Sequence, residues 1–169
     1  MAEYWDIYDK DRKKTGRLMQ RGEPMADEDY HLVVMAWIRN SRGQWFLTKR
    51  SEHKSMPLLW EVPGGSVLAG EDSIHGVLRE IREETGIAVE DGTLFRSFRR
   101  DKISWENPGF LDIWVFQKDF DLSDVRLQPE ETCDCRWATA EEILQLMEDG
   151  TFMPMKEHPY HLELFDAYK

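Results

Sequence analysis

Two hydrophobic periodicities alternate along the chain and predict both strands and helices. Apolar runs typical of strands occur at residues 4–8, 30–39, 44–49, 93–99, 110–118 and 134–138. One segment, 72–85, instead has its apolar residues at the helical spacing i, i+3, i+4 and i+7, namely Ile74, Val77, Leu78 and Ile81. A second helix is predicted at 140–149. Mixed strands and helices favour an α/β fold, an α/β/α sandwich with helices on both sides of a mixed sheet.

Polar and glycine-rich segments predict where these elements end. Thr139 and Glu142 form a capping box that begins the second helix, and Gly86 is placed to end the first. Residues 9–16 are polar and turn-like, and the short apolar segment 58–62 stops at a breaker cluster, Pro63-Gly64-Gly65. A chain of 169 residues suits one domain. We divide it into an N-terminal extension with a short strand (1–29), a core (30–150) and a C-terminal segment (151–169).

The charge of the chain narrows the classes of partner. The net charge is −11, so binding to a nucleic-acid backbone is not expected, because that affinity comes mainly from Lys and Arg. Small phosphorylated substrates remain compatible, since metal ions in an acidic site can carry the phosphates. No signal peptide or apolar membrane span is evident, which predicts a cytoplasmic protein that does not contact membranes. Cys133 and Cys135 fit alternate positions of one strand.

The helix at 72–85 breaks a local rule of helix design. Glu80, Glu83 and Glu84 stand at i, i+3 and i+4 and share one face, where each like-charge pair costs roughly 0.2–0.5 kcal/mol. The last two also lie where the helix dipole disfavours anions. Such violations mark functional sites, and Mg²⁺ prefers carboxylate oxygens. A solvated acidic face is the alternative. Gly76, one turn earlier, is interpreted as leaving space for a metal or a phosphate.

The wider sequence resembles a known signature. Gly65, five residues, Glu71, seven residues and then Arg79-Glu80-Ile81-Arg82-Glu83-Glu84-Thr85-Gly86-Ile87 is similar to the complete Nudix box, with every fixed position filled. Flanking features also resemble the family, including Lys49-Arg50, Trp60 to Gly65 and Arg136-Trp137 before a helix. The resemblance covers roughly residues 30 to 150, and it implies the α/β/α sandwich of the Nudix fold.

The resemblance also implies roles for individual residues. Glu80, Glu83 and Glu84 would bind divalent metals, Mg²⁺ with Mn²⁺ as a substitute. Arg79 would orient a glutamate, with Glu83 as the expected partner, and Glu71 would support the helix start. Gly64 and Gly65 would let the backbone approach the substrate near the metals. The implied reaction is attack of a metal-activated water on a diphosphate phosphorus.

Residues outside the box carry weaker hypotheses. Glu131 is the candidate general base and Glu130 the alternate, against the option of an exposed acidic turn. Arg50 either reaches a substrate phosphate or forms an ordinary ion pair. Trp105 and Phe110 either stack on a substrate base or pack in the core. A basic patch meets a distal phosphate or is simply solvated; its members are Arg99, Arg100 and Lys102.

The N-terminal region resembles a branch of the superfamily related to isopentenyl-diphosphate isomerase. The matching segments are 5–9, 15–17 and Tyr30-His31-Leu32. That resemblance implies metal binding by His31, against a structural role for a histidine entering a strand. The isomerase uses a cysteine just before its metal helix, but here the segment 59–65 has none. Isomerisation is therefore disfavoured.

The combined expectation is a magnesium-dependent hydrolase. It would cleave a diphosphate linkage in a nucleoside diphosphate derivative or a related organic pyrophosphate. The alternatives are an isomerase-like enzyme and a non-catalytic nucleotide-sensing module. No Tyr lies between Gly86 and Pro159, and Pro108 lies beyond the usual family position, so neither the dinucleoside polyphosphate nor the ADP-ribose subclass is favoured. Many relatives form homodimers, which leaves the oligomeric state open.

Overall fold

A mixed sheet forms the centre of the molecule. The structure is a computed structural model, and it describes residues 1–102, 107–155 and 159–169. Within these residues the sheet has seven strands, and its main path runs β5-β4-β3-β8-β7, with β6 paired to β3 and β9 to β4. The strands are β3 (His31–Arg39), β4 (Trp45–Arg50), β5 (Trp60–Glu61), β6 (Gly64–Ser66), β7 (Thr93–Arg100), β8 (Gly109–Gln117) and β9 (Thr132–Ala138). Only β3 and β8 pair in parallel in this part of the chain.

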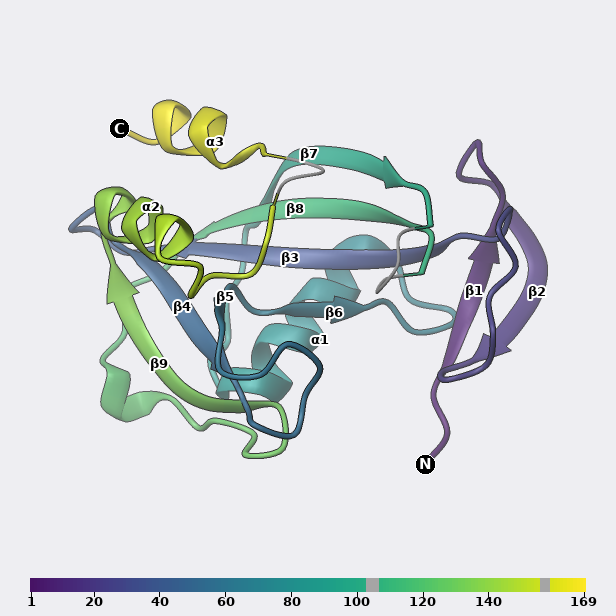
Figure 1. Cartoon of the computed structure of the whole chain (residues 1–169), viewed down its shortest axis with the longest axis horizontal. Coiled ribbons are helices and arrows are strands. Elements are labelled where there is room, and N and C mark those ends of the chain that lie inside the picture. Colours follow the sequence, from purple (N-terminus) through teal and green to yellow (C-terminus); the bar gives the residue numbers. More distant parts are fainter. Residues whose placement is uncertain (103–106, 156–158) are drawn as a thin grey trace.

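Helices cover both faces of this sheet, as the alternating pattern predicted (Figure 1). On β3, Val34 and Ala36 are fully buried in the core that includes α1. Trp37 points to the opposite face and joins the core of the other two helices. Successive residues of a strand point to opposite faces, so one apolar run supplies both cores. The helices are α1 (Ser73–Thr85), α2 (Ala140–Glu148) and α3 (His161–Ala167).

The two predicted helices begin and end where their capping residues stand. The side chain of Asp72 accepts the backbone N–H of His75 and caps α1, and Gly86 ends the helix with a left-handed φ of 72°. That φ costs glycine little, because it has no Cβ. The Thr139–Glu142 capping box at α2 is also present. The apolar stripe of α1 faces the sheet, where Val77 and Ile81 are completely buried.

Strands β2 (Lys14–Gln20) and β6 and helix α3 were not predicted, each for a physical reason. Strand β2 was interpreted in part as a turn, because only Met19 of its seven residues is buried and no alternation results. Strand β6 falls in the Pro-Gly-Gly cluster that was interpreted as a breaker. A Cβ on Gly64 would lie 2.3 Å from the carbonyl oxygen of Val34, so only glycine allows this pairing. Helix α3 has only seven residues, too few for a clear periodicity.

The N-terminal extension forms a separate two-stranded sheet beside the main one. Strand β1 (Tyr4–Tyr8) pairs with β2, and the hairpin has a small core of its own that includes Trp5 and Met19. It lies at one end of β3 (Figure 1, purple). A bridge between Tyr8 and Tyr30 connects the hairpin to the start of β3. No helix in the described residues is long and apolar enough to cross a membrane.

Candidate functional site

Strands β3 and β4 diverge, and the site lies where they separate. They pair only next to their hairpin, at Arg39 and Trp45, after which β6 takes the place beside β3. A cavity of about 490 Å³ is present on this side of β3. One part of its lining is apolar and includes Val33, Met35, Phe152, Met153 and Met155. The other part is charged and includes Arg21, Arg50, Lys54, Glu61 and Glu131, together with Gly64 and Gly65 of β6.

Arg79 organises the carboxylates of the box, which lie beside Gly64 and Gly65 but are not themselves part of the described cavity wall. Its Nη1 donates to Glu80 at 3.0 Å and to Glu83 at 3.1 Å, so the ion pair expected from the helical spacing is present. Its Nε and Nη2 donate to the two carboxylate oxygens of Glu71, at 2.8 and 3.1 Å. A further bond to the carbonyl oxygen of Ser66 ties the helix to β6. One guanidinium thus joins the helix, the preceding loop and the glycine strand.

Glu84 is the least neutralised of the box glutamates. It is only 6% exposed, and its carboxylate accepts one hydrogen bond, from the backbone N–H of Gly64 at 3.3 Å. Among the described residues it has no ion-pair partner. Burial, together with the charges of Glu80 and Glu61, raises the pKa of Glu84 well above its ordinary value. Burial also raises the pKa of Glu80, although Arg79 opposes the shift. A nearby cation stabilises the ionised form most in buried carboxylates of this kind, whose pKa is raised.

The donor set therefore fits a hard divalent cation. Mg²⁺ is held by one or two carboxylates together with waters and phosphates, so a complete protein cage is not required. In the described part of the chain, no three His, Cys, Asp or Glu side chains are already gathered as a metal site. Arg79 contacts the carboxylates of Glu80 and Glu83, whereas that of Glu84 accepts the backbone N–H of Gly64.

Two glycines near the glutamates have different reasons to be glycine. A Cβ on Gly65 would lie 2.5 Å from a carboxylate oxygen of Glu80, so the missing side chain leaves room for that group. The interpretation of Gly76 as space for a metal or a phosphate is wrong. This residue is buried, and its Cβ would lie 2.7 Å from a methyl group of Val67. Close packing of α1 against the segment that follows β6 explains that glycine.

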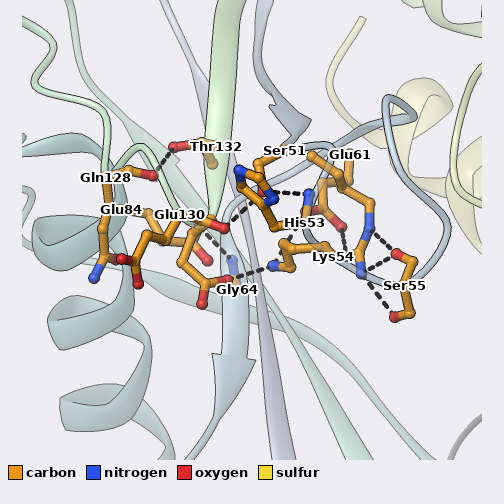
Figure 2. A network of polar contacts seen from close by, with 12 residues as sticks. Ser51, His53, Lys54, Ser55, Glu61, Gly64, Glu84, Gln128, Glu130 and Thr132 are labelled. Atoms are coloured by element: carbon orange, nitrogen blue, oxygen red, sulfur yellow. Dashed lines mark hydrogen bonds and ion pairs between the residues drawn. The ribbon is translucent and has the colours of Figure 1, made fainter.

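A network of polar contacts joins the loop after β4 to the loop before β9, beside Glu84 and Gly64 (Figure 2). The hydroxyl of Ser51 donates to the carbonyl oxygen of Glu130 at 2.6 Å. The backbone N–H of Ser51 donates to the carbonyl oxygen of Glu131 at 3.0 Å. The ammonium of Lys54 lies 2.7 Å from the Glu131 carboxylate and 3.9 Å from that of Glu61. Burial has the largest effect and raises the pKa of Glu131, but the hydrogen bond from Lys54 and the charges of Lys54, Arg21 and Arg50 together make the net shift downward.

The two candidates for the general base are now distinguished by position. Glu131 lines the cavity, and its side chain is one third exposed. The side chain of Glu130 is exposed, and the residue is not part of the described cavity wall. Glu131 is therefore the better placed of the two to meet a bound substrate.

Of the proposed substrate-side residues, Arg50 and Phe110 have internal partners. Arg50 lines the cavity, but it donates to Glu61 at 2.8 Å and to the carbonyl oxygen of Ser55 at 2.7 and 2.9 Å. Phe110 is buried and packs against Tyr30 in the core. Both observations favour the structural alternatives. Trp105 lies outside the described residues.

The basic patch divides between the surface and the cavity. Arg99 pairs with Asp101, and Lys102 pairs with Asp27. Arg100 is buried, lines the cavity and donates to the carbonyl oxygen of Asn107 at 3.1 Å. Only this member of the patch faces the site.

His31 lines the cavity in a structural setting. Its ring stacks on Trp5 at 4.3 Å between centroids, and its Nδ1 lies 3.0 Å from the carbonyl oxygen of Pro108. Burial, aided by the charge of Arg100, lowers the pKa of His31 to about 4. The ring is therefore neutral at pH 7. These contacts favour the structural role over metal binding.

Three charged residues of the cavity were absent from the sequence-based predictions. Glu61 and Lys54 come from the region between β4 and β6, and Arg21 follows β2. Loops, and a strand of only two residues such as β5, have no periodicity that reveals the direction of a side chain. The only available signal was residue type, and the sequence has many other charged residues of the same types.

Comparison with known proteins agrees with this geometry. The NUDIX domain family matches residues 29–157. A Nudix hydrolase of Listeria monocytogenes is 39% identical over 156 residues, which cover 90% of this chain and 89% of the relative. The asymmetrical bis(5'-nucleosyl)-tetraphosphatase of Sus scrofa is 36% identical over 90 residues, 52% of this chain and 60% of that protein.

The fold has a close counterpart among solved structures. A crystal structure of a Deinococcus radiodurans protein matches with a TM-score of 0.75 at 23% identity, covering 98% of this chain and 99% of that one. At this identity the likeness concerns the fold, and it confirms the predicted α/β architecture. The family match covers α1, β6 and most of the residues that line the cavity. The chain therefore belongs to the Nudix family, as a Nudix-type pyrophosphohydrolase.

Proposed function

We propose that this enzyme is a magnesium-dependent hydrolase that cleaves a diphosphate linkage in a nucleoside diphosphate derivative or a related organic pyrophosphate. Glu80, Glu83 and Glu84 would hold the metal, with Mn²⁺ as a substitute. The observation that carries this proposal is the buried carboxylate of Glu84, which has a raised pKa and no ion pair among the described residues. A protein retains such a group at a cost to stability, so a bound cation is the natural counterpart.

The residues of the site would have separate roles in the reaction. Bound magnesium would polarise the phosphoryl oxygens and a water molecule. Arg79 holds Glu80 and Glu83 in place on the helix, and Glu71 in turn orients Arg79. Gly65 keeps the space beside Glu80 free of a side chain. Glu131 would accept the proton of the attacking water as general base.

The organic part of the substrate would occupy the apolar part of the cavity. Met35, Phe152 and Met155 offer flat and polarisable surfaces there, which suit an aromatic base. The tetraphosphatase among the relatives acts, by its name, on a nucleotide. Both points support a nucleoside diphosphate derivative over a simple inorganic diphosphate.

Hydrolysis is favoured over isomerisation by the position of the thiols. Moving a double bond requires a group that protonates carbon. In the isomerase that the N-terminal region resembles, a cysteine has that role. Cys133 and Cys135 both lie on β9, and neither is part of the described cavity wall. We expect no dimethylallyl diphosphate from isopentenyl diphosphate, even after long incubation.

The first prediction tests the metal. Magnesium-dependent release of phosphate should be nearly lost in Glu84→Gln and in Glu83→Gln, because the shape is kept but the charge is removed. Since Glu84 is buried and destabilised as an anion, Glu84→Gln should also raise the Tm of the metal-free protein. Glu148→Gln, in the last turn of α2, is the matched control and should change neither quantity.

The assay is a phosphate-release screen over nucleoside triphosphates, nucleotide sugars, ADP-ribose and prenyl diphosphates. Activity that persists in EDTA, or in both site variants, would contradict the proposal.

A further inference from the structure

Four cationic side chains line the described part of the cavity, and each could meet a substrate phosphate. They are Arg21, Arg50, Lys54 and Arg100. A diphosphate has more negative charge than the metal alone neutralises. At least one of these cations is therefore expected to bind it directly. Their present contacts show which of them can bind a phosphate without breaking an interaction that stabilises the protein.

Two of the four, Arg50 and Lys54, already bind partners in the loop network. The side chain of Arg50 is 11% exposed, and its donors are directed to Glu61 and to the loop at Ser55. The side chain of Lys54 is 20% exposed and pairs with Glu131 at 2.7 Å. Moving either cation toward a substrate would leave a partly buried carboxylate without its partner, which is costly.

Arg100 is also held in place. It is only 7% exposed, and two of its nitrogens donate to the carbonyl oxygen of Asn107, at 3.1 and 3.3 Å. A buried guanidinium with these bonds is part of the cavity wall. Its charge reaches the cavity, but its donors are directed to the backbone.

Arg21 differs from the other three in exposure. Its side chain is 59% exposed, and its one ion pair is with Glu3, which is itself 40% exposed. Only Nη1 is used in that contact, at 2.8 Å. Among the described residues, its Nε and Nη2 donate no hydrogen bond. Exposed ion pairs of this kind are weak, so exchange of the Glu3 carboxylate for a phosphate oxygen is easy.

The hairpin holds Arg21 close to the proposed reaction centre. The backbone N–H of Arg21 donates to the carbonyl oxygen of Glu3 at 2.9 Å, which fixes the end of β2 against the chain before β1. The hydrogen bond that Arg21 donates to Glu3 comes first in raising the pKa of Arg21, and the charges of Glu3, Glu131 and Glu80 add to it. The guanidinium thus lies within electrostatic range of the proposed base and of a proposed metal ligand.

We propose that Arg21 is a substrate-binding residue that holds a non-bridging phosphate oxygen of the diphosphate. The inference rests on the proposed function, because it requires a diphosphate in this cavity. The planar guanidinium fork suits two oxygens of one phosphate. Arg21 precedes residue 29, where the Nudix domain match begins. The N-terminal hairpin therefore supplies part of the substrate site from outside the matched domain.

The hairpin itself provides a matched control. Arg17 lies on β2, its side chain is also 59% exposed, and it pairs with one carboxylate, that of Asp29. It is not part of the described cavity wall. Arg17→Met and Arg21→Met therefore each remove one exposed guanidinium and its ion pair, which has two hydrogen bonds at Asp29 and one at Glu3. Only the second variant removes a donor from the cavity.

The experiment measures binding of imidodiphosphate, a diphosphate that resists hydrolysis, by titration calorimetry with and without Mg²⁺. Loss of one charged hydrogen-bonding group should weaken binding by about 10- to 100-fold in Arg21→Met. Arg17→Met should bind within about twofold of the wild type, as an exposed ion pair contributes little. Both variants should have the same Tm and the same affinity for Mg²⁺ alone. Arg21→Lys should be intermediate.

Equal imidodiphosphate affinity in the two methionine variants would overturn the role of Arg21, and so would a wild type that does not bind the probe. A lower Tm in Arg21→Met alone would assign the residue to hairpin stability and overturn the proposal as well. Failure of the proposed function has a different signature, since phosphate release in the substrate screen decides it independently of this binding.

Discussion

At the scale of the residue, charge in this site is set by a few direct contacts. Glu131 is partly buried, which would favour its protonated form, yet the ammonium of Lys54 at 2.7 Å keeps its pKa below the ordinary value. A base must be ionised to act. Lys54 therefore extends the pH range in which Glu131 is available, at the expense of some intrinsic basicity.

The second prediction follows from this pair. Glu131→Gln should lower the turnover number by roughly 10²- to 10⁴-fold, the usual contribution of a general base. Glu130→Gln, one residue away but exposed, should stay within a few-fold of the wild type. Steady-state kinetics on any substrate found in the screen decides between them. Similar activity in both variants would place the base in the box.

The same pair predicts a change in pH dependence. In Lys54→Met the pKa of Glu131 should rise, so the acid limb of the kcat/KM profile should move to higher pH. Lys49→Met is the control, because that ammonium lies over the Trp60 ring instead, at 5.4 Å from its centroid. An acid limb that does not move in Lys54→Met would mean that Glu131 is not the titrating base.

At the scale of the element, the position of α1 depends on close packing at one glycine. Alanine is favoured over glycine in a helix by roughly 1 kcal/mol, so propensity alone predicts that Gly76→Ala stabilises the protein. The tertiary contact predicts the opposite. The added methyl group would lie 2.7 Å from Val67, which is itself buried.

The third prediction is that packing outweighs propensity. Gly76→Ala should destabilise the protein by about 1–3 kcal/mol, the usual cost of overpacking. In a Val67→Ala background, the same change should cost less or even stabilise, because the clashing methyl groups are gone. Urea unfolding of the wild type, the two single variants and the double variant measures both effects. A higher Tm in the Gly76→Ala single variant would contradict the packing argument.

At the scale of the whole molecule, a buried ion pair connects the N-terminal hairpin to the main sheet. Arg12, in the turn between β1 and β2, donates to both oxygens of Asp112 on β8, at 2.7 and 2.5 Å. Ser73 of α1 and Ser97 of β7 donate to the same carboxylate. Asp112 is completely buried. Burial opposes its ionisation, but the hydrogen bonds, led by that from Arg12, lower the pKa of Asp112.

The fourth prediction concerns this connection. Arg12→Met should destabilise the protein by about 3 kcal/mol, near the lower end for breaking a buried pair, because Arg12 is 34% exposed. A lowered pKa means that the stabilisation is present above the ordinary value of 3.8 and is lost as the pH falls below it. The difference in unfolding free energy from the wild type should therefore be full at pH 7 and should narrow below about pH 4.

Lys14→Met provides the comparison, since it removes an exposed ion pair with Asp6 from the same hairpin. Its effect should stay below about 1 kcal/mol. Equal effects of the two variants at pH 7 would show that the buried pair is not what anchors the hairpin.

The sequence alone determined those features that depend on local spacing. The helix that carries Glu80, Glu83 and Glu84 was predicted because its apolar residues recur every three to four positions, and Gly86 marks its end. Most long strands followed from apolar runs. The Arg79–Glu83 ion pair followed from helical geometry, since residues four apart face each other.

Only the tertiary structure decided which distant side chains meet. Strand β6 is stabilised by backbone pairing with β3, and Gly76 is explained by a contact with Val67, neither of which leaves a local pattern. Arg21 and Lys54 come from segments without periodicity, and they reach the cavity because a hairpin and a loop fold over it. Local spacing specifies an element and its faces. The direction of a loop side chain depends on contacts across the fold, which one sequence does not encode position by position.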